Sequence, residues 1–141
     1  MIFECLLGRW TAAGIATGVA FGAMLGLIPP GNLVSLAVLL LLFFSGSNLV
    51  FAGLNALFFL LLARWIAPWA DRIGEAVLTL PVVQRFGSRA WEYPLVAWTD
   101  LDNTVVLGQT LIGLVLFLPL LLLVWGVLRA GRKSSKSEAA S

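Results

Sequence analysis

Residues 10–63 read WTAAGIATGVAFGAMLGLIPPGNLVSLAVLLLLFFSGSNLVFAGLNALFFLLLA, and these 54 positions contain no Asp, Glu, Lys, Arg or His. A helix needs about 20 apolar residues to cross a hydrocarbon core about 30 Å thick, so the run is long enough for two or three membrane elements. The whole chain of 141 residues is 60% apolar and only 11% charged. We therefore expect an all-α integral membrane protein with a single membrane domain over residues 1–128.

Four glycines recur at every fourth position near the start of this run. They are Gly14, Gly18, Gly22 and Gly26. At about 3.6 residues per turn, this spacing places them on one face of a helix predicted from about Thr11 to Ile28. Small residues let two helix backbones approach closely in a membrane, so the series predicts a helix-contact face. The partner is either another helix of this chain or another protein.

Two turns interrupt the apolar run. The first consists of Pro29, Pro30, Gly31 and Asn32, and the second of Ser45, Gly46, Ser47 and Asn48. The prolines lack a backbone N–H and end the first helix, whereas the asparagines are suited to cap the helices that follow. The helix between the turns, residues 33–44, would be only about 18 Å long. We therefore expect a re-entrant or half-span helix, with a thin complete span as the alternative.

Two further spanning helices are predicted, over residues 49–67 and residues 104–128. Each contains one intramembrane polar side chain, Asn55 in the first and Gln109 in the second. An amide in lipid needs a partner, so we interpret Asn55 as an interhelical hydrogen-bonding group, with contact to a substrate as the alternative. Asp102 or Asn103 is predicted to cap the last helix.

The segment between these spans, residues 64–102, is predicted to be an external interfacial region. Apolar side chains from Trp65 to Leu80 recur at helical spacing, opposite a face with mixed charges, and Pro81 is expected to end this helix. A second short amphipathic piece is predicted from Val82 to Tyr93. Because the charges of the segment are mixed, burial of apolar side chains would supply most of its adhesion to a bilayer.

The distribution of charge predicts the topology. Arg129, Arg132, Lys133 and Lys136 follow the last span, which places the C-terminus on the cytoplasmic side. Residues 64–102 contain four arginines and five carboxylates, so this region has no positive excess and is expected outside. An even number of crossings then places the N-terminus in the cytoplasm. Residues 129–141, rich in Ser, Ala and Lys, are expected to form a disordered basic cytoplasmic tail.

The residue inventory argues against an enzyme. The chain has no His and a single cysteine, Cys5, which leaves no internal disulfide and no usual zinc or haem arrangement. It also lacks a nucleophile beside a base and a phosphate-binding loop. We expect no catalytic residues, no cofactor and no metal site. The basic C-terminus is interpreted as a topology signal, and no nucleic-acid partner is expected.

Two stretches carry a resemblance to known proteins. They are LGLIPPGN, residues 25–32, after the glycine-spaced helix, and DNTVVLG, residues 102–108, before the last helix. Together they resemble a family of small, uncharacterised bacterial membrane proteins, related to a wider domain-of-unknown-function family with the same Gly-rich helix and Pro-Gly turn. The likeness covers most of residues 10–128. It implies a bacterial inner-membrane location and a larger membrane-anchored companion, and it supplies no catalytic residues.

We therefore expect a non-enzymatic inner-membrane subunit that contacts membrane lipids. Its glycine face would dock to a larger envelope assembly or to a second copy, and lipid handling or lipid transport is the accompanying hypothesis. The alternative is a small oligomeric transporter or channel that uses its broken helices to bind an amphiphilic or small-molecule substrate. Residues 10–63 and 103–128 contain no ionisable side chain that would couple such transport to protons.

Overall fold

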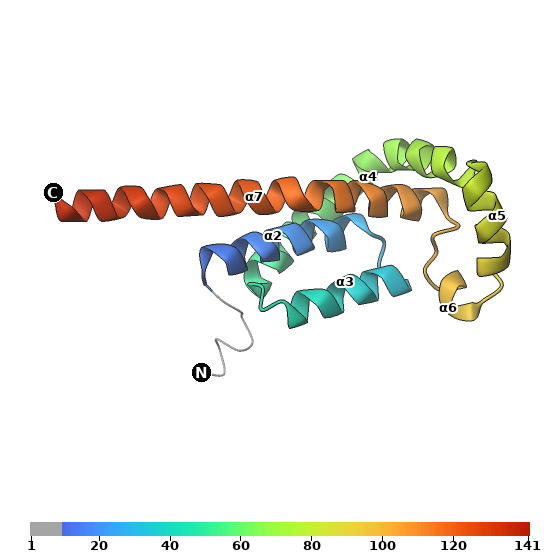
Figure 1. Cartoon of the computed structure of the whole chain (residues 1–141), viewed down its shortest axis with the longest axis horizontal. Coiled ribbons are helices and arrows are strands. Elements are labelled where there is room, and N and C mark those ends of the chain that lie inside the picture. Colours follow the sequence, from blue (N-terminus) through green and yellow to red (C-terminus); the bar gives the residue numbers. More distant parts are fainter. Residues whose placement is uncertain (1–9) are drawn as a thin grey trace.

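The computed structural model describes residues 10–141, and this part of the chain is helical without strands. The helices are α2 (Ala12–Leu27), α3 (Leu33–Phe44), α4 (Leu49–Leu78), α5 (Pro81–Ala90), α6 (Pro94–Ala97) and α7 (Thr104–Ala140). Helices α2 and α4 run in one direction, and α3 and α7 run in the other (Figure 1). The expected all-helical class is confirmed.

Short polar side chains begin each of the four long helices. Thr11 Oγ1 accepts from Gly14 N at 3.0 Å, Asn32 Oδ1 from Ser35 N at 2.8 Å, Asn48 Oδ1 from Val50 N at 3.1 Å, and Asn103 Oδ1 from Val105 N at 3.0 Å. Each bond satisfies a backbone N–H that has no partner inside its own helix. The caps therefore set the positions at which the apolar chain reverses direction.

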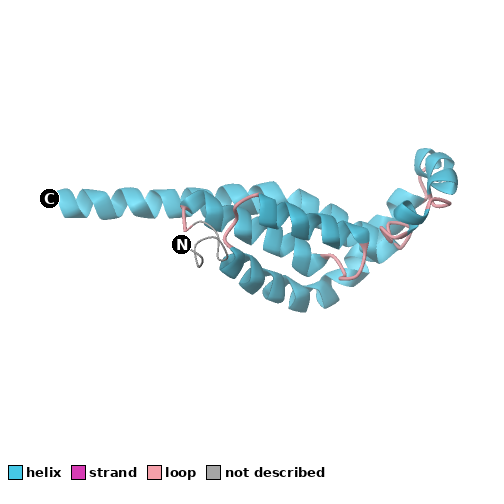
Figure 2. Ribbon diagram, turned by 90° about the horizontal axis from the view of Figure 1, so that it is seen from below, coloured by secondary structure: helices cyan, strands magenta, loops and turns pink. Residues whose placement is uncertain are grey.

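Helices α2, α4 and α7 pack against one another and form a three-helix unit. Helix α3 lies beside α2 at the edge of this unit (Figure 1), and short loops without strands connect the helices of residues 10–141 (Figure 2). A small apolar core joins them, in which Met24 of α2 and Ile28, directly after α2, meet Val38 of α3. Phe21 of α2 and Phe117 of α7 pack edge to face beside it, with ring centroids 4.9 Å apart.

Helices α4 and α7, with 30 and 37 residues, are long and apolar enough to cross a membrane, and α2 and α3 are shorter apolar helices. Large apolar side chains are exposed along all of them except α2, as shown by Phe44 at 85% and Val115 at 72% exposure. A soluble protein of this size rarely exposes a continuous apolar surface of this kind. Length, composition and exposure thus favour association with a membrane.

The predicted boundary at Ala67 was wrong, because α4 continues through Pro68 to Leu78. A proline inside a helix removes one hydrogen bond, but packing beyond it can hold the helix together. Here Ala70 and Gly74 are buried, and their backbones lie against the start of α7. The segment 64–102 therefore begins as an extension of α4, and α5 then runs across the direction of α7 (Figure 1).

Residues 129–140 also differ from expectation, because the structure continues α7 through them to Ala140 in place of a disordered tail. Extending an existing helix needs no new nucleation step. Most residues of 129–140 are Ala, Arg, Lys or Glu, which are good helix formers. Gly131 is the only glycine, and this segment contains no proline. Residues 129–140 therefore form an exposed extension of α7.

Candidate functional site

The glycine face of α2 is covered by α4 of the same chain. A Cβ atom built on Gly18 would lie 2.5 Å from Asn48 O, one on Gly22 would lie 2.3 Å from Ala52 O, and one on Gly26 would lie 2.3 Å from Ala56 O. Real Cβ atoms do not approach oxygen so closely, so only glycine permits this helix spacing. These three positions are therefore not free to receive a partner protein.

Gly14 and the second turn meet at one end of this contact. Asn48 N donates to Gly14 O at 2.9 Å, and Asn48 is completely buried. Its Nδ2 has no hydrogen-bond partner within residues 10–141. Asn48 thus holds the start of α4 against α2, and the predicted turn residues Ser45, Gly46, Ser47 and Asn48 connect α3 to α4. Their role in the structure is to join two helices.

The two side-chain amides of the apolar helices, Asn55 and Gln109, form hydrogen bonds between helices. Asn55 Nδ2 on α4 donates to Val19 O on α2 at 2.6 Å. Gln109 Nε2 on α7 donates to Ala63 O on α4 at 3.2 Å, while its Oε1 is buried without a partner among the described residues. Asn55 therefore performs the interhelical role predicted for it. Gln109 also joins two helices, but its Oε1 accepts no hydrogen bond from residues 10–141.

A second close contact, between α4 and α7, was not predicted. A Cβ atom on Gly108 would lie 1.8 Å from Ala70 O, and one on Gly74 would lie 1.8 Å from Thr104 O. Asp71 accepts a hydrogen bond from the Thr104 hydroxyl beside this contact. The sequence signal was present, because residues 70 and 74 and residues 104 and 108 each form a pair of small residues four positions apart.

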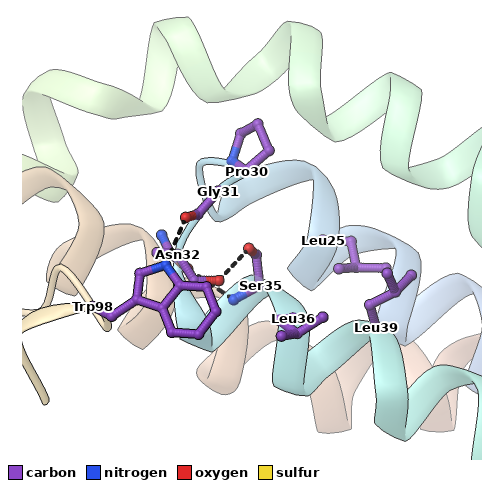
Figure 3. Close-up of a pocket in the computed structure, with 8 residues that line it drawn as sticks. All are labelled: Leu25, Pro30, Gly31, Asn32, Ser35, Leu36, Leu39 and Trp98. Carbon is purple, nitrogen blue, oxygen red and sulfur yellow. Dashed lines mark hydrogen bonds between the residues drawn. The ribbon is translucent and has the colours of Figure 1, made fainter. Parts of the chain in front are cut away.

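The first turn meets a distant tryptophan. Leu33 N donates to Trp98 O at 2.9 Å, and Trp98 Nε1 donates to Gly31 O at 3.2 Å (Figure 3). Gly31 has a φ of +100°, which a side chain would strain. Asn32 is buried and bonds to Pro29 O through Nδ2. The segment around α6 is thereby fixed to the hairpin of α2 and α3.

A pocket of about 360 Å³ lies beside this turn. Leu25 of α2 and Leu36 and Leu39 of α3 form its apolar wall, and the Trp98 ring lies at its other end (Figure 3). Its polar groups already have partners, since Asn32 Oδ1 accepts from Ser35 N and the Ser35 hydroxyl donates to Asn32 O. An occupant would therefore be held mainly by apolar contact.

Sequence reasoning located only part of this pocket. It singled out Pro30, Gly31 and Asn32 as a turn, but it did not connect Trp98 with them. No periodicity connects residues 31 and 98, so their contact could be found only in the folded chain. Leu36 and Leu39 line the pocket, but the sequence does not distinguish them from the other apolar residues of the same helix.

Groups suited to metal binding do not converge in the part of the chain that the structure describes. Residues 10–141 contain no cluster of three or more His, Cys, Asp or Glu side chains that could hold an ion. The only cysteine, Cys5, lies outside these residues. The candidate site is therefore built from apolar side chains and backbone groups.

Comparison with known proteins found one distant relative. An uncharacterised protein of Treponema pallidum (strain Nichols) is 26% identical over 118 residues, which cover 84% of this chain and 73% of the relative. No family model matches the chain, and no solved structure matches it. Membership of the small bacterial membrane-protein family therefore stays a prediction.

Proposed function

We propose that this chain is a non-enzymatic, multi-pass protein of the bacterial inner membrane that binds a membrane lipid at the hairpin of α2 and α3. The observation that carries the proposal is the apolar pocket of about 360 Å³ beside the Pro-Pro-Gly-Asn turn. Its volume falls in the range of about 300–1,000 Å³ that is usual for small-molecule sites. Its largely apolar lining suits an acyl chain.

The arrangement of charged and aromatic side chains supports the membrane placement. At one end of the bundle, Arg132 Nη2 donates to Trp10 O at 3.2 Å, and Arg129 stacks on Trp125. Toward the other end, Trp98 lines the pocket at the hairpin, and Trp69 of α4 is also exposed. Basic and aromatic residues are typical of the two membrane boundaries. On this placement, both termini face the cytoplasm.

Helix α5 supports the interfacial part of the placement. Val82, Val83 and Phe86 lie on one side of the helix and Gln84 and Ser88 on the other, with the exposed Arg85 and Arg89 at the boundary between the two sides. A helix of this kind lies in the plane of a bilayer surface, with its apolar side chains among the lipids. Its direction across α7 agrees with that orientation (Figure 1).

The earlier hypothesis of a subunit docked through its glycine face needs revision. Gly18, Gly22 and Gly26 already contact α4, so a larger assembly or a second copy would have to meet a different surface. The transporter alternative gains no support at the two turns. There Asn32 and Asn48 accept hydrogen bonds from backbone N–H groups at the starts of α3 and α4, so these groups are not left for a substrate. Lipid binding at the hairpin is the hypothesis that the geometry favours.

Photo-crosslinking can test lipid binding at this pocket. The purified protein would be reconstituted in nanodiscs that contain a phospholipid with a photoreactive acyl chain, and labelled peptides would be mapped by mass spectrometry. We expect labelling to concentrate on residues 25–39 and around Trp98. Leu36→Trp should fill the pocket and abolish the concentrated labelling, because the larger ring occupies the space an acyl chain would use.

The matched control is Leu114→Trp, which changes an exposed leucine of α7 that does not line this pocket. Its labelling of residues 25–39 should equal that of the wild type. Uniform labelling along every exposed helix, or labelling that persists in Leu36→Trp, would contradict lipid binding at the hairpin.

A further inference from the structure

A second apolar groove, of about 270 Å³, lies between the beginning of α2 and the second half of α7. Small residues from the first turns of α2 form one wall, and large apolar residues of α7 form the other. The lining consists of Ala13, Ala16, Thr17, Leu121, Leu122 and Trp125. The Thr17 hydroxyl already donates to Ala13 O at 2.9 Å, so it seeks no further acceptor. The groove therefore suits an acyl chain.

The α7 wall of the groove continues along the same helix as a stripe of basic residues. At about 100° per residue, the groove residues of α7 and all the basic residues of its extension fall within an arc of about 120°. The basic stripe consists of Arg129, Arg132, Lys133 and Lys136, and all four line a hollow of about 470 Å³. Glu138, the only carboxylate after Asp102, falls on the opposite face by the same spacing. The stripe therefore keeps its positive charge.

Two contacts bring the groove and the basic stripe together. The Arg129 guanidinium lies over the ring of Trp125, 4.7 Å from its centroid, and this tryptophan lines the groove. Stacking uses the flat face of a guanidinium and leaves the N–H donors at its edge for an acceptor. Arg132 reaches the start of α2, where its Nη2 donates to Trp10 O at 3.2 Å. Two guanidinium groups therefore stand at the end of the groove.

The spacing along α7 matches the depth of a headgroup layer. Arg129 and Arg132 follow Trp125 by about 6 and 10 Å along the helix axis, and the headgroup layer on each side of a bilayer is about 5–8 Å thick. Figure 1 shows the extension of α7 projecting beyond the start of α2. The N-terminal end of α2 also carries a partial positive charge, which favours an anion here.

We propose that the groove and the basic stripe together bind one anionic phospholipid of the cytoplasmic leaflet. An acyl chain lies between α2 and α7, and the phosphate accepts hydrogen bonds from Arg129 and Arg132. Lys133 and Lys136 add positive charge beyond them, which favours a headgroup of net negative charge over a zwitterionic one. This site lies at the other end of α2 from the hairpin pocket. It shares only the membrane placement with the proposed function.

Competition between two lipids tests the selectivity. The full-length protein, delipidated in mild detergent, would be titrated with phosphatidylglycerol and phosphatidylcholine of identical acyl chains, and bound lipid would be counted by native mass spectrometry. We expect phosphatidylglycerol to bind about tenfold more tightly or better, because its net charge is attracted by the whole stripe. Glycerol phosphate, which lacks acyl chains, should not displace it at a tenfold excess. Equal binding of the two lipids, or displacement by glycerol phosphate, would overturn the proposal.

A pair of double variants tests the role of the arginines. Arg129→Gln with Arg132→Gln should lower the binding of phosphatidylglycerol to about the level of phosphatidylcholine. The matched control is Arg85→Gln with Arg89→Gln, which removes the same charge from two exposed arginines of α5. It should leave the tenfold preference intact. Equal losses in the two double variants would show attraction by overall charge and would contradict a site at the stripe.

Ala13→Phe tests the groove. Ala13 is exposed and lines the groove, so the added ring would occupy the space of an acyl chain without entering the core. We expect phosphatidylglycerol binding to weaken about tenfold. Ala130→Phe makes the same change at an exposed position of α7 that lines neither the groove nor the basic hollow, and it should bind as the wild type does. Unchanged binding in Ala13→Phe would contradict the placement of the acyl chain.

The outcomes separate this site from lipid binding at the hairpin. Leu36→Trp should abolish the labelling of residues 25–39 and leave the preference for phosphatidylglycerol intact. Uniform labelling together with a preference that only the stripe and groove variants remove would refute the hairpin site and support this one. Should the double variant of Arg129 and Arg132 fail to fold, the comparison of the two lipids on the wild type and on Ala13→Phe still decides the matter.

Discussion

The three-helix unit and α3 are held in different ways. Within the unit, backbone meets backbone, so that Gly22 of α2 has no room for a Cβ atom beside Ala52 of α4. Helix α3 instead contacts α2 through side chains, and only Val38 and Leu42 of its twelve residues are buried. Close backbone contact leaves little freedom to move, whereas a few side-chain contacts and a cap can be exchanged for lipid. The unit is therefore the scaffold, and α3 is the more readily displaced wall of the pocket.

The largest predicted effect comes from Gly108→Ala. A Cβ atom at this position would lie 1.8 Å from Ala70 O, so the backbones of α4 and α7 must separate. Alanine favours a helix by about 1 kcal/mol over glycine, but we expect the overpacking to outweigh this and to destabilise the protein by about 3 kcal/mol or more. Equilibrium unfolding by SDS in mild detergent measures the difference.

The control for Gly108→Ala is Gly126→Ala in the same helix, where an added Cβ atom meets nothing within 4 Å. This change should be neutral or stabilise the protein by up to about 1 kcal/mol. Equal destabilisation by the two substitutions would show that the close contact of α4 and α7 does not hold the unit together.

A somewhat smaller effect is expected for Gly22→Ala, whose Cβ atom would lie 2.3 Å from Ala52 O. We expect a loss of about 2–3 kcal/mol, because α2 and α4 must move apart along their contact. Gly53→Ala, on the opposing helix but with open space around it, provides the matched control. If Gly53→Ala lowered the free energy of unfolding more than Gly22→Ala, the contact between the glycine face and α4 would not be a main source of stability.

The glycine face shows both the strength and the limit of the sequence. The four-residue spacing correctly predicts close helix contact at Gly18, Gly22 and Gly26, because the absence of a side chain on one helix face can be read from the local sequence. The identity of the partner is a tertiary property. The sequence pattern fits an external protein and α4 equally well, and only the folded chain shows that α4 occupies the face.

The helix boundaries also include some that the sequence predicts and some that depend on tertiary contacts. The bounds of α3 follow from two local turns, and the structure places it at Leu33–Phe44 as predicted. The bounds of α4 do not, because Pro68 is tolerated only through the buried contact of Ala70 and Gly74 with α7. The pocket beside Trp98 likewise depends on a contact between residues 67 positions apart. Such contacts leave no periodic trace in one sequence.

The smallest predicted effect sharpens the contrast between α3 and the unit. Asn32→Ala removes the side chain that accepts from Ser35 N at 2.8 Å and donates to Pro29 O at 3.0 Å. Loss of a helix cap costs about 1 kcal/mol, and we expect it to fall on α3 rather than on the whole protein. Hydrogen exchange followed by mass spectrometry should show faster exchange in residues 33–44 and unchanged exchange in α2 and α4.

Asn103→Ala, which removes the cap of α7, is the comparison, because that helix is held by the glycine contact at Gly108 and should lose protection only in its first turn. Exchange that accelerates equally in α2, α3 and α4 after Asn32→Ala would show that α3 is an integral part of the unit and is not displaced separately.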